Sequence, residues 1–486
     1  MRATLGTVPR RRTELGLLIL ALAITGCAYA LVSLGRTAVL PTNLRPFLLV
    51  IAGLLAAAHI ATRRLARFAD ASLLSLAGVL NGIGYVFIVR LKPDLANKQA
   101  AWTAIGIGAY VGTLMLVRQA RRLEYSRYTF ALVGGVLLLM PMIPGVGYER
   151  NGSRIWVHVG PITFQPGEVA KLTLAVFFAS YLVEKRELLA VAGRRVGGIT
   201  IPEIRHLGPI VVAWLGSIAI MVAEKDLGSS LLFFALFVTM LWVATGRTFY
   251  ISLGGLMFFG GATASYHLFE HVKTRVSTWI NPWPVANGKG FQLIQSLYAF
   301  GSGGISGTGL ALGSPTRIPA AYNDFIFAAI GEELGLFGTT AVLALFLLMV
   351  GTGLRIALRA DVAFDKLLAT GLTAIIGVQT FIIVGGVTRL VPLTGVTLPF
   401  VSYGGSSLVV NYVLIALLVR ISHDTNVRAG VTAPPSLLQR RKIRRADRAL
   451  AEVGGEWTRM DLSKTTSRKA SRRARRRQQQ RRGGDG

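Results

Sequence analysis

The chain has 486 residues, of which 52% are hydrophobic, and its mean hydropathy of +0.53 excludes an ordinary water-soluble domain and indicates an integral membrane protein. Its formal net charge is +30. Beside a membrane, such a charge indicates attraction to anionic lipid headgroups, so we expect the membrane as a partner and no nucleic acid. Cys27 is the only cysteine, which excludes an intramolecular disulfide and a cysteine-based metal site.

Residues 14–35 are predicted to form the first membrane span, after a cytoplasmic N-terminus of residues 1–13. Arg10–Arg12 support this orientation, because positive residues favour the cytoplasmic side. The sequence up to Cys27 resembles a bacterial lipoprotein cleavage site. The apolar run continues to Leu34, however, so we interpret the segment as an uncleaved span.

Apolar runs recur along the whole chain and predict an all-α polytopic membrane protein with about twelve transmembrane helices and both termini in the cytoplasm. We divide the rest into a two-helix N-terminal extension (14–69), a membrane core (70–421) and a basic, disordered cytoplasmic tail (422–486). The predicted spans are 14–35, 46–62, 70–90, 99–117, 128–145, 168–183, 208–223, 228–245, 248–268, 326–351, 367–388 and 405–421.

Three stretches then fall on the outer face, and the first is 146–167. Pro166 is a natural first helical residue, which places Glu168 and Lys171 on one helix face. They form either a structural salt bridge or a site in which Lys171 meets an anionic substrate. Upstream, Arg154 supplies a guanidinium, and Trp156 supplies either a flat apolar binding surface or an anchor at the membrane interface.

The second outer stretch is a long loop, 269–325, between spans 9 and 10. It contains Lys273 and Arg275, and its glycine-rich part lets backbone amides approach a ligand closely. Gln292, Gln295 and Ser296 recur at near-helical spacing, which predicts a polar face on a re-entrant or interfacial helix.

The third outer stretch, 389–404, begins with a basic residue, Arg389, on the side where basic residues are disfavoured. Two prolines and a glycine pair interrupt regular helix there, and broken helix at membrane depth is tolerated only beside protein or a polar cavity. Ser402 and Ser406 fall in its motif LPFVSYGGSS, at the boundary with the last span.

Two acidic residues stand at the starts of spans. Asp226, in AEKDLGSS, either caps the following helix or points inward. Asp324 closes the long loop, in YNDFIFAAIGEELG, at the edge of hydrocarbon. A carboxylate there is costly to desolvate and is a functional candidate, although an acidic residue at a helix start also favours the helix dipole. With the outer cations, these residues indicate a ligand with a phosphate head and a lipid tail.

Several motifs are absent from the sequence. It holds no GxxxxGK[ST] loop of an ATP-driven pump, no DxD pair for a nucleotide sugar's metal and no HExxH zinc motif. No cofactor is therefore predicted with certainty. Binding of a divalent cation, Mg2+ or Mn2+, by the carboxylates stays an open possibility, and the residues that would bind a metal are unknown.

Five motifs, QPGEVAK, KDLGSS, GFQLIQS, NDFIFAAIGEELG and LPFVSYGGSS, occur in the order typical of SEDS proteins, and the similarity covers about residues 70 to 421. The chain therefore resembles the SEDS (RodA/FtsW/SpoVE) family of peptidoglycan glycosyltransferases. Its N-terminal extension and Arg-rich tail look like those of actinobacterial members, and GGVTRLVPLTG looks closer to the RodA branch than to FtsW. Departures from the motifs at Gly167, Asn323 and Glu224-Lys225 keep the charged positions but alter the surroundings of Asp226.

The resemblance implies a ten-span core that polymerises the lipid-linked precursor lipid II at the outer face of the cytoplasmic membrane, beside a class B penicillin-binding protein. It implies that Asp324 is the catalytic acidic residue and that Trp156 is essential. It also implies that Arg154, Glu168, Lys171 and Asp226 line the central cavity.

The resulting hypothesis is that Asp324 accepts the proton of the acceptor's 4-hydroxyl, and that Arg154, Lys171 and Arg389 stabilise the leaving pyrophosphate. Three other interpretations stay open: a division-specific FtsW-type polymerase, a lipid II flippase and a scaffold. A flippase needs a polar path that reaches both faces, whereas a polymerase needs its critical residues on the outer side.

Overall fold

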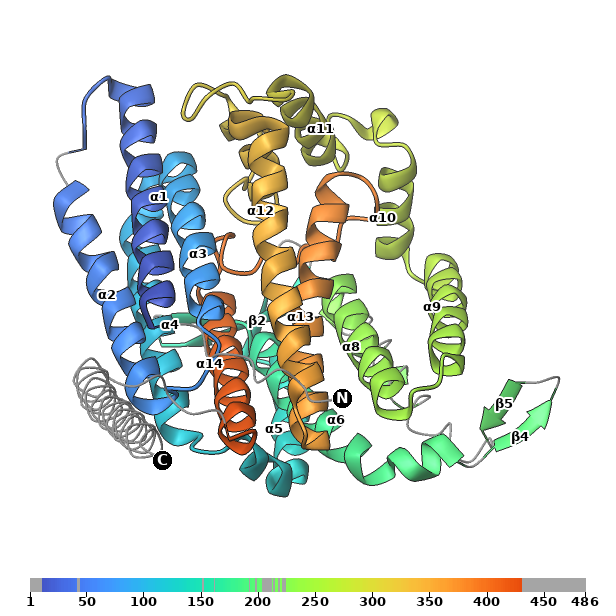
Figure 1. Ribbon diagram of the computed structural model, residues 1–486. Helices are drawn as coiled ribbons and strands as arrows, with labels where there is room; N and C mark the ends of the chain where they lie inside the picture. Colours follow the sequence, from blue (N-terminus) through green and yellow to red (C-terminus); the bar gives the residue numbers. More distant parts are fainter. Residues whose placement is uncertain are drawn as a thin grey trace, which may run out of the picture. The chain divides into compact units, whose positions relative to one another are not determined.

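The computed structural model describes residues 11–41, 44–150, 153–160, 162–191, 193–196, 199–202 and 224–430, together with the single positions 212, 215, 216, 219 and 220. Most of these residues are helical, which confirms the predicted helical membrane fold (Figure 1). The N-terminal residues 1–10, nearly all of the predicted span 208–223, and the tail from 431 onwards lie outside the described residues.

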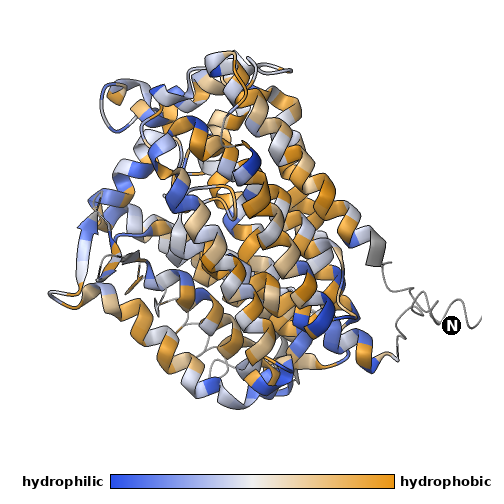
Figure 2. Cartoon of the chain, turned by 90° about the vertical axis from the view of Figure 1, so that its left-hand side faces the viewer, coloured by the Kyte–Doolittle hydropathy of each residue, from blue (hydrophilic) through white to orange (hydrophobic). Residues whose placement is uncertain are grey.

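Nine helices in the described part of the chain have the length and apolar composition of a membrane span. Apolar residues dominate them, whereas hydrophilic residues gather toward the helix ends and in the connections (Figure 2). The nine are α1 (Arg11–Thr37), α2 (Leu44–Leu65), α3 (Ser72–Leu91), α4 (Ala96–Leu116), α6 (Pro166–Val191), α8 (Leu227–Thr245), α12 (Ile326–Arg359), α13 (Ala363–Val387) and α14 (Gly405–Arg428).

The predicted spans 128–145 and 248–268 are not among these nine helices, and 208–223 lies almost wholly outside the described residues. The count of twelve spans therefore stays a prediction. The predicted span 128–145 is too long, because α5 (Arg127–Leu139) has only 13 residues and passes into the 3-10 turn Met140–Met142. Pro141 and Pro144 cannot continue the helical hydrogen bonds, although the run is apolar. α9 (Phe249–Leu268) coincides with the predicted span 248–268 but is not among the nine.

Short strands, which the sequence analysis did not predict, precede and follow α6. An antiparallel sheet is formed by β1 (Gly147–Arg150), β2 (Ser153–Val159) and β3 (Ile162–Phe164), in that order. β4 (Gly193–Val196) pairs with β5 (Ile199–Pro202). In the three-stranded sheet, Tyr148 lies opposite Trp156 and its ring stacks on His158. These cross-strand pairs stabilise the sheet.

The N-terminal extension packs on the core, with α1 beside α3 and α2 beside α4. Within the extension, the buried Glu14 of α1 accepts a hydrogen bond of 2.9 Å from His59 Nδ1 and forms an ion pair with Arg63, both on α2. A buried carboxylate requires such partners. The two helices are therefore joined by side chains as well as by their connection.

α14 continues to Arg428, seven residues beyond the predicted end at 421, so the predicted boundary of the tail at 422 is wrong. The last two turns of α14 are polar in sequence but have partners. Asp424 Oδ2 accepts a hydrogen bond from Ala120 N (2.9 Å), and Arg428 Nη1 donates one to Asp365 Oδ2 (2.6 Å). Contacts with distant residues thus extend a helix that hydropathy would end.

The long outer loop contains two further helices, α10 (Glu270–Ile280) and α11 (Phe291–Gly303), the second of which matches the predicted polar-faced helix. After α11, residues 304–314 run beside a break in α12 at Gly335, where φ is 64°. Thr308 N and Gly309 N donate to the carbonyl oxygens of Glu332 and Glu333 (2.9 and 3.0 Å). The loop thereby satisfies the backbone groups that the break sets free.

Candidate functional site

The three predicted outer stretches meet at one end of the helices. Ser153 Oγ of β2 donates to the carbonyl oxygen of Lys225 (3.3 Å), next to the start of α8. Arg275 Nη1 of α10 donates to the carbonyl oxygen of Leu393 (2.9 Å). Ser402 Oγ donates to the carbonyl oxygen of Asn323 (2.6 Å). Polar residues far apart in the sequence are therefore gathered around the segment that carries Asp324.

Asp324 lies in the turn just before α12, and its side chain is half-buried. A Cβ atom added at Gly395 would lie 3.9 Å from Asp324 Oδ2, so the carboxylate faces the 389–404 segment. Burial raises the pKa of Asp324 to about 6; the Arg275 charge opposes this rise and the Asp226 charge adds to it. A carboxylate with a pKa near neutrality is a better proton acceptor than an ordinary one while still being ionised at pH 7.

Asp226 is the N-cap of α8, which confirms the first of its two predicted alternatives. Its Oδ1 accepts hydrogen bonds from Gly228 N (2.9 Å) and Ser229 N (3.3 Å), and its Oδ2 accepts one from Ser229 Oγ (2.6 Å). The side chain is buried, and its charge nevertheless acts on Asp324. Burial and the Asp226 charge also raise the pKa of Glu224 to about 8.

Glu168 and Lys171 form a buried ion pair on the first turns of α6, with 2.5 Å between Oε2 and Nζ. Lys171 Nζ also donates to Gln379 Oε1 of α13 (2.9 Å), and Gln379 Nε2 donates to the carbonyl oxygen of Thr397 (2.8 Å). This chain of hydrogen bonds connects Lys171 with the segment that faces Asp324. The contacts of Glu168 and Lys171 are those of a structural salt bridge. The Lys171 ammonium also lies beside the site, through Gln379.

Arg154 and Trp156 share one face of β2, because side chains two residues apart on a strand point the same way. The opposite face carries Ser153, which contacts Lys225 O, and the buried Val157. Arg154 is half-buried and makes no hydrogen bond or ion pair with any other residue that the structure describes. Arg154 and Trp156 therefore lie on the face of β2 opposite to the contact with Lys225.

Several other predicted binding residues hold the fold of the outer face. Arg389 Nε donates to the carbonyl oxygen of Trp279 (2.8 Å), and Trp279 Nε1 donates back to Arg389 O (3.1 Å). Ser296 Oγ donates to Val387 O (2.9 Å). The exposed Gln292 donates to Pro319 O (3.2 Å). Gln295 is half-buried on α11, Ser402 is buried in its bond to Asn323 O, and Ser406 is buried in the first turn of α14.

The sequence analysis missed the roles of Arg275 and Gln379. Arg275 was noted only as a cation of the long loop, although its position four residues after His271 places both on one face of α10. The Arg275 charge also acts on His271: burial, Arg275 and Lys225 lower the pKa of this histidine. Gln379 gave no signal, because a polar residue inside an apolar run has many structural uses.

The donor set fits a resident metal poorly. Within the described residues, no three His, Cys, Asp or Glu side chains come together as a metal site. Both oxygens of the Asp226 carboxylate already accept hydrogen bonds from the start of α8. No step of the chemistry below is therefore assigned to a metal.

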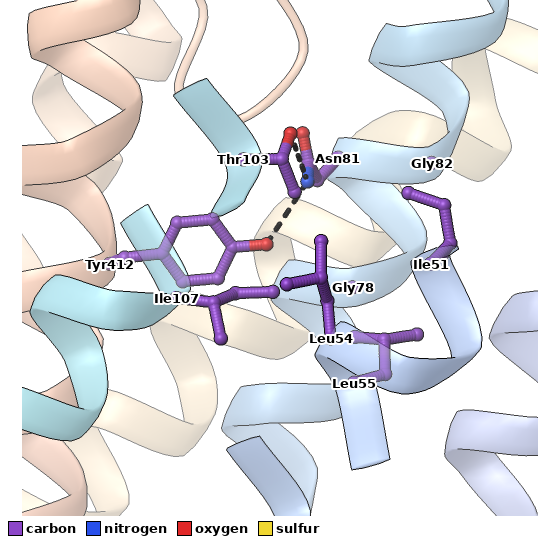
Figure 3. A pocket seen from close by; sticks show the side chains of 9 residues that line it. All are labelled: Ile51, Leu54, Leu55, Gly78, Asn81, Gly82, Thr103, Ile107 and Tyr412. Carbon is purple, nitrogen blue, oxygen red and sulfur yellow. Dashed lines mark hydrogen bonds between the residues drawn. The ribbon is translucent and has the colours of Figure 1, made fainter. Parts of the chain in front are cut away.

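A small pocket lies away from this site, among α2, α3, α4 and α14 (Figure 3). Its wall is mostly apolar, and Asn81 Nδ2 donates there to Tyr412 Oη (3.1 Å) and Thr103 Oγ1 (3.3 Å). It holds none of the predicted site residues, and its interest is that Leu54 and Leu55 of the extension help to close it.

Comparisons with known proteins identify the family of the chain. Residues 76–427 match the profile of the FtsW/RodA/SpoVE family, described as cell cycle proteins. The chain is 43% identical over 425 residues to the "Peptidoglycan glycosyltransferase RodA" of Mycobacterium tuberculosis, covering 85% of this chain and 91% of that one. The protein of the same description from Mycobacterium leprae is 42% identical over 428 residues, with the same coverage.

Two solved structures have a similar fold. One comes from work described as "Structural coordination of polymerization and crosslinking by a peptidoglycan synthase complex", with a TM-score of 0.60 and 26% identity over 74% of this chain and 98% of that one. The other is the rod shape determining protein RodA of Thermus thermophilus, with a TM-score of 0.52 and 24% identity over 73% and 97% of the two chains. From the profile match and the mycobacterial relatives together, the chain belongs to the FtsW/RodA/SpoVE family.

Proposed function

We propose that this membrane protein is a peptidoglycan glycosyltransferase that polymerises lipid II into β-1,4-linked glycan strands at the outer face of the cytoplasmic membrane, with Asp324 as its general base. The observation that carries the proposal is the setting of Asp324: a half-buried carboxylate with a pKa of about 6, beside Arg275 and at the meeting point of three polar segments.

The reaction needs one proton acceptor and stabilisation of one leaving group. The ionised Asp324 takes the proton of the acceptor sugar's 4-hydroxyl while that oxygen forms a bond to C1 of the donor sugar. The bond from C1 to the pyrophosphate oxygen breaks with inversion, and the polyprenyl pyrophosphate leaves with the electron pair.

Three cations have different relations to the leaving pyrophosphate. Arg154 has no partner among the described residues, and we assign it to binding the phosphates. Lys171 lies beside the site but must share its charge with Glu168. Arg389 already donates to the carbonyl oxygens at the end of α10, so we assign it to holding the loop. A divalent cation, Mg2+ or Mn2+, enters this proposal only as a counter-ion that accompanies the pyrophosphate of the substrate.

The proposal includes a partner and a location. A chain of similar fold belongs to a peptidoglycan synthase complex that couples polymerization to crosslinking. We infer that this chain likewise works beside a class B penicillin-binding protein, which supplies the crosslinking, with both termini in the cytoplasm. Its kinship with mycobacterial RodA supports a role in cell elongation and shape.

Polymerisation of labelled lipid II by the purified full chain tests the proposal, with and without the cognate penicillin-binding protein. Wild type should produce long strands and a folded Asp324→Asn variant none, because the amide keeps the shape but cannot accept the proton. Equal synthesis by the two would exclude Asp324 as the base.

The same preparation, reconstituted in vesicles, tests the flippase alternative. Translocation of lipid II without any polymer would replace the proposed enzyme by a transporter. In the described part of the chain, two charges at the other helix ends have structural partners: Asp424 and Arg420 bond to main-chain groups of Ala120 and Leu65 and hold helix ends together.

A further inference from the structure

The N-terminal extension reaches the loop that leads to Asp324. Gly35, near the C-terminal end of α1, comes so close to residues 310–311 that an added Cβ atom would lie 2.5 Å from Leu310 O and 3.1 Å from Ala311 Cβ. Real Cβ atoms essentially never approach a carbonyl oxygen so closely, so this contact exists only because residue 35 is glycine.

The packing of α1 on α3 fixes this approach. The two helices run in the same direction, since Leu18 contacts Gly78 and Thr25 contacts Gly82 further along both. A Cβ atom at Gly82 would lie 1.9 Å from Thr25 Oγ1, so the helices are in direct contact there. The C-terminal ends of α1 and α3 therefore lie side by side, with Gly35 near the end of α1 and Arg90 near the end of α3.

The same loop residue, Ala311, is held from the side of the core. Arg90 Nη2 donates to Ala311 O (3.2 Å), and Ala311 N donates to Glu333 Oε2 (3.0 Å). Arg90 Nε and Glu333 Oε1 form an ion pair of 3.0 Å. The extension and the core thus contact one residue from two sides.

Ala311 also needs such support. Its φ is +67°, in the left-handed region that a residue with a Cβ atom adopts at a cost of about 1 kcal/mol. A non-glycine residue persists there only where its surroundings fix it. The segment around Ala311 is connected to the site at both ends. Residues 304–309 pair with α12 at its break, and the chain after Ala311 continues to Asp324.

We propose that α1 is a positioning element of the active site: through Gly35 it presses on Leu310 and Ala311 and, with Arg90 and Glu333, fixes the segment that places Asp324. The extension, residues 14–69, lies outside residues 76–427, which match the family profile, so this would be a device added to the common core. The inference rests on the proposed function for its catalytic part and on geometry alone for the contact.

A pair of matched variants tests it in the full-length chain in lipid nanodiscs. Gly35→Val places a branched side chain against Leu310 O, whereas Gly16→Val makes the same change in the same helix where nothing lies within 4 Å. Valine is the better helix former in both places, so helix propensity cannot account for a difference.

Hydrogen exchange provides a readout that is independent of activity. The amides of Thr308, Gly309 and Ala311 are hydrogen-bonded to residues 332–333, so exchange in 304–314 reports the state of the segment. We expect Gly35→Val to accelerate it and to lower kcat on the order of tenfold to a hundredfold, with little change in KM. Gly16→Val should match wild type in both.

Each other outcome overturns the positioning role. Unchanged exchange and activity in Gly35→Val would remove the contact. Faster exchange with normal polymerisation would leave a contact that positions nothing. Exchange that also rises throughout α12–α14, in both Gly35→Val and the gentler Gly35→Ala, would make α1 a support of the whole fold. A wild-type chain without activity would sink the proposed function, while exchange would still decide whether α1 holds the loop.

Discussion

Arg275 on α10 donates a hydrogen bond to the carbonyl oxygen of Leu393 over 2.9 Å, and this bond ties α10 to the segment that faces Asp324. The guanidinium therefore has two effects. It joins two outer segments, and its positive charge lowers the pKa of Asp324 against the rise caused by burial. Substitutions of the charges around Asp324 should separate these effects.

Arg275→Gln should move the acidic limb of the pH–rate profile to higher pH. The base must be ionised, so the rate of wild type should fall as the pH drops through about 6. Without the positive charge the pKa of Asp324 rises further, and more alkaline conditions are needed. Steady-state polymerisation across a pH series measures this. Arg389→Gln is the control: it also loosens α10 from the loop, but its charge is not among those that act on Asp324, so its limb should stay in place.

Asp226→Asn should shift the same limb in the opposite direction. The negative charge of Asp226 raises the pKa of Asp324, so its removal should let the base stay ionised at lower pH. Asparagine is as good an N-cap as aspartate, which keeps the start of α8 intact. If the acidic limb of the pH–rate profile moves to higher pH in this variant, or does not move, the two carboxylates do not interact in the working enzyme.

Lys171→Met should destabilise the protein by about 3–5 kcal/mol, because it leaves the Glu168 carboxylate buried without its partner. Thermal unfolding in detergent measures the loss, and the double variant Glu168→Gln, Lys171→Met should recover much of it. Glycan synthesis by the double variant then assigns the role of Lys171. Recovered synthesis would make the pair structural, whereas a stable but slow double variant would show that the ammonium serves the substrate.

Asp324→Asn should be at least as stable as wild type at pH 7.5. The pKa of Asp324 is raised from 3.8 to about 6 in the folded protein, so its stabilising contribution is complete below pH 3.8 and is lost as the pH rises through about 6. An amide avoids this loss. Melting temperatures of the two proteins at pH 5 and 7.5 test the sign, and a lower value for the variant at the higher pH would contradict the raised pKa.

The sequence predicted the fold where length and hydropathy decide it. The starts of α6, α12 and α14 agree closely with the predicted spans, since Pro166, Asp324 and the Gly404-Gly405 pair mark them locally. It failed where distant contacts override local character. The polar end of α14 stays helical because Asp424 and Arg428 have partners elsewhere, and the apolar end of α5 stops at prolines.

The site was predicted in part for the same reason. Its carboxylates and the Glu168–Lys171 pair stand at recognisable helix starts, and the structure gathers them with the outer segments. The separate uses of Arg275 and Arg389 depend on which carbonyl groups each can reach, across more than a hundred residues of sequence. The sequence alone does not show which carbonyl groups lie within reach, so Arg389 was predicted to bind the substrate and the role of Arg275 was missed.

The joint between α11, the loop after it and the broken α12 places a limit on how this protein can vary. A Cβ atom at Gly303 would meet Gly331 O at 2.0 Å, and one at Gly335 would meet Gly307 N at 2.3 Å. The opposing atoms belong to the main chain, so no second substitution can shrink them and rescue the first. In a saturation library these positions should admit no replacement in any genetic background, whereas charges such as Arg275 can be exchanged and compensated. Adaptation of the enzyme must therefore proceed around this joint and not through it.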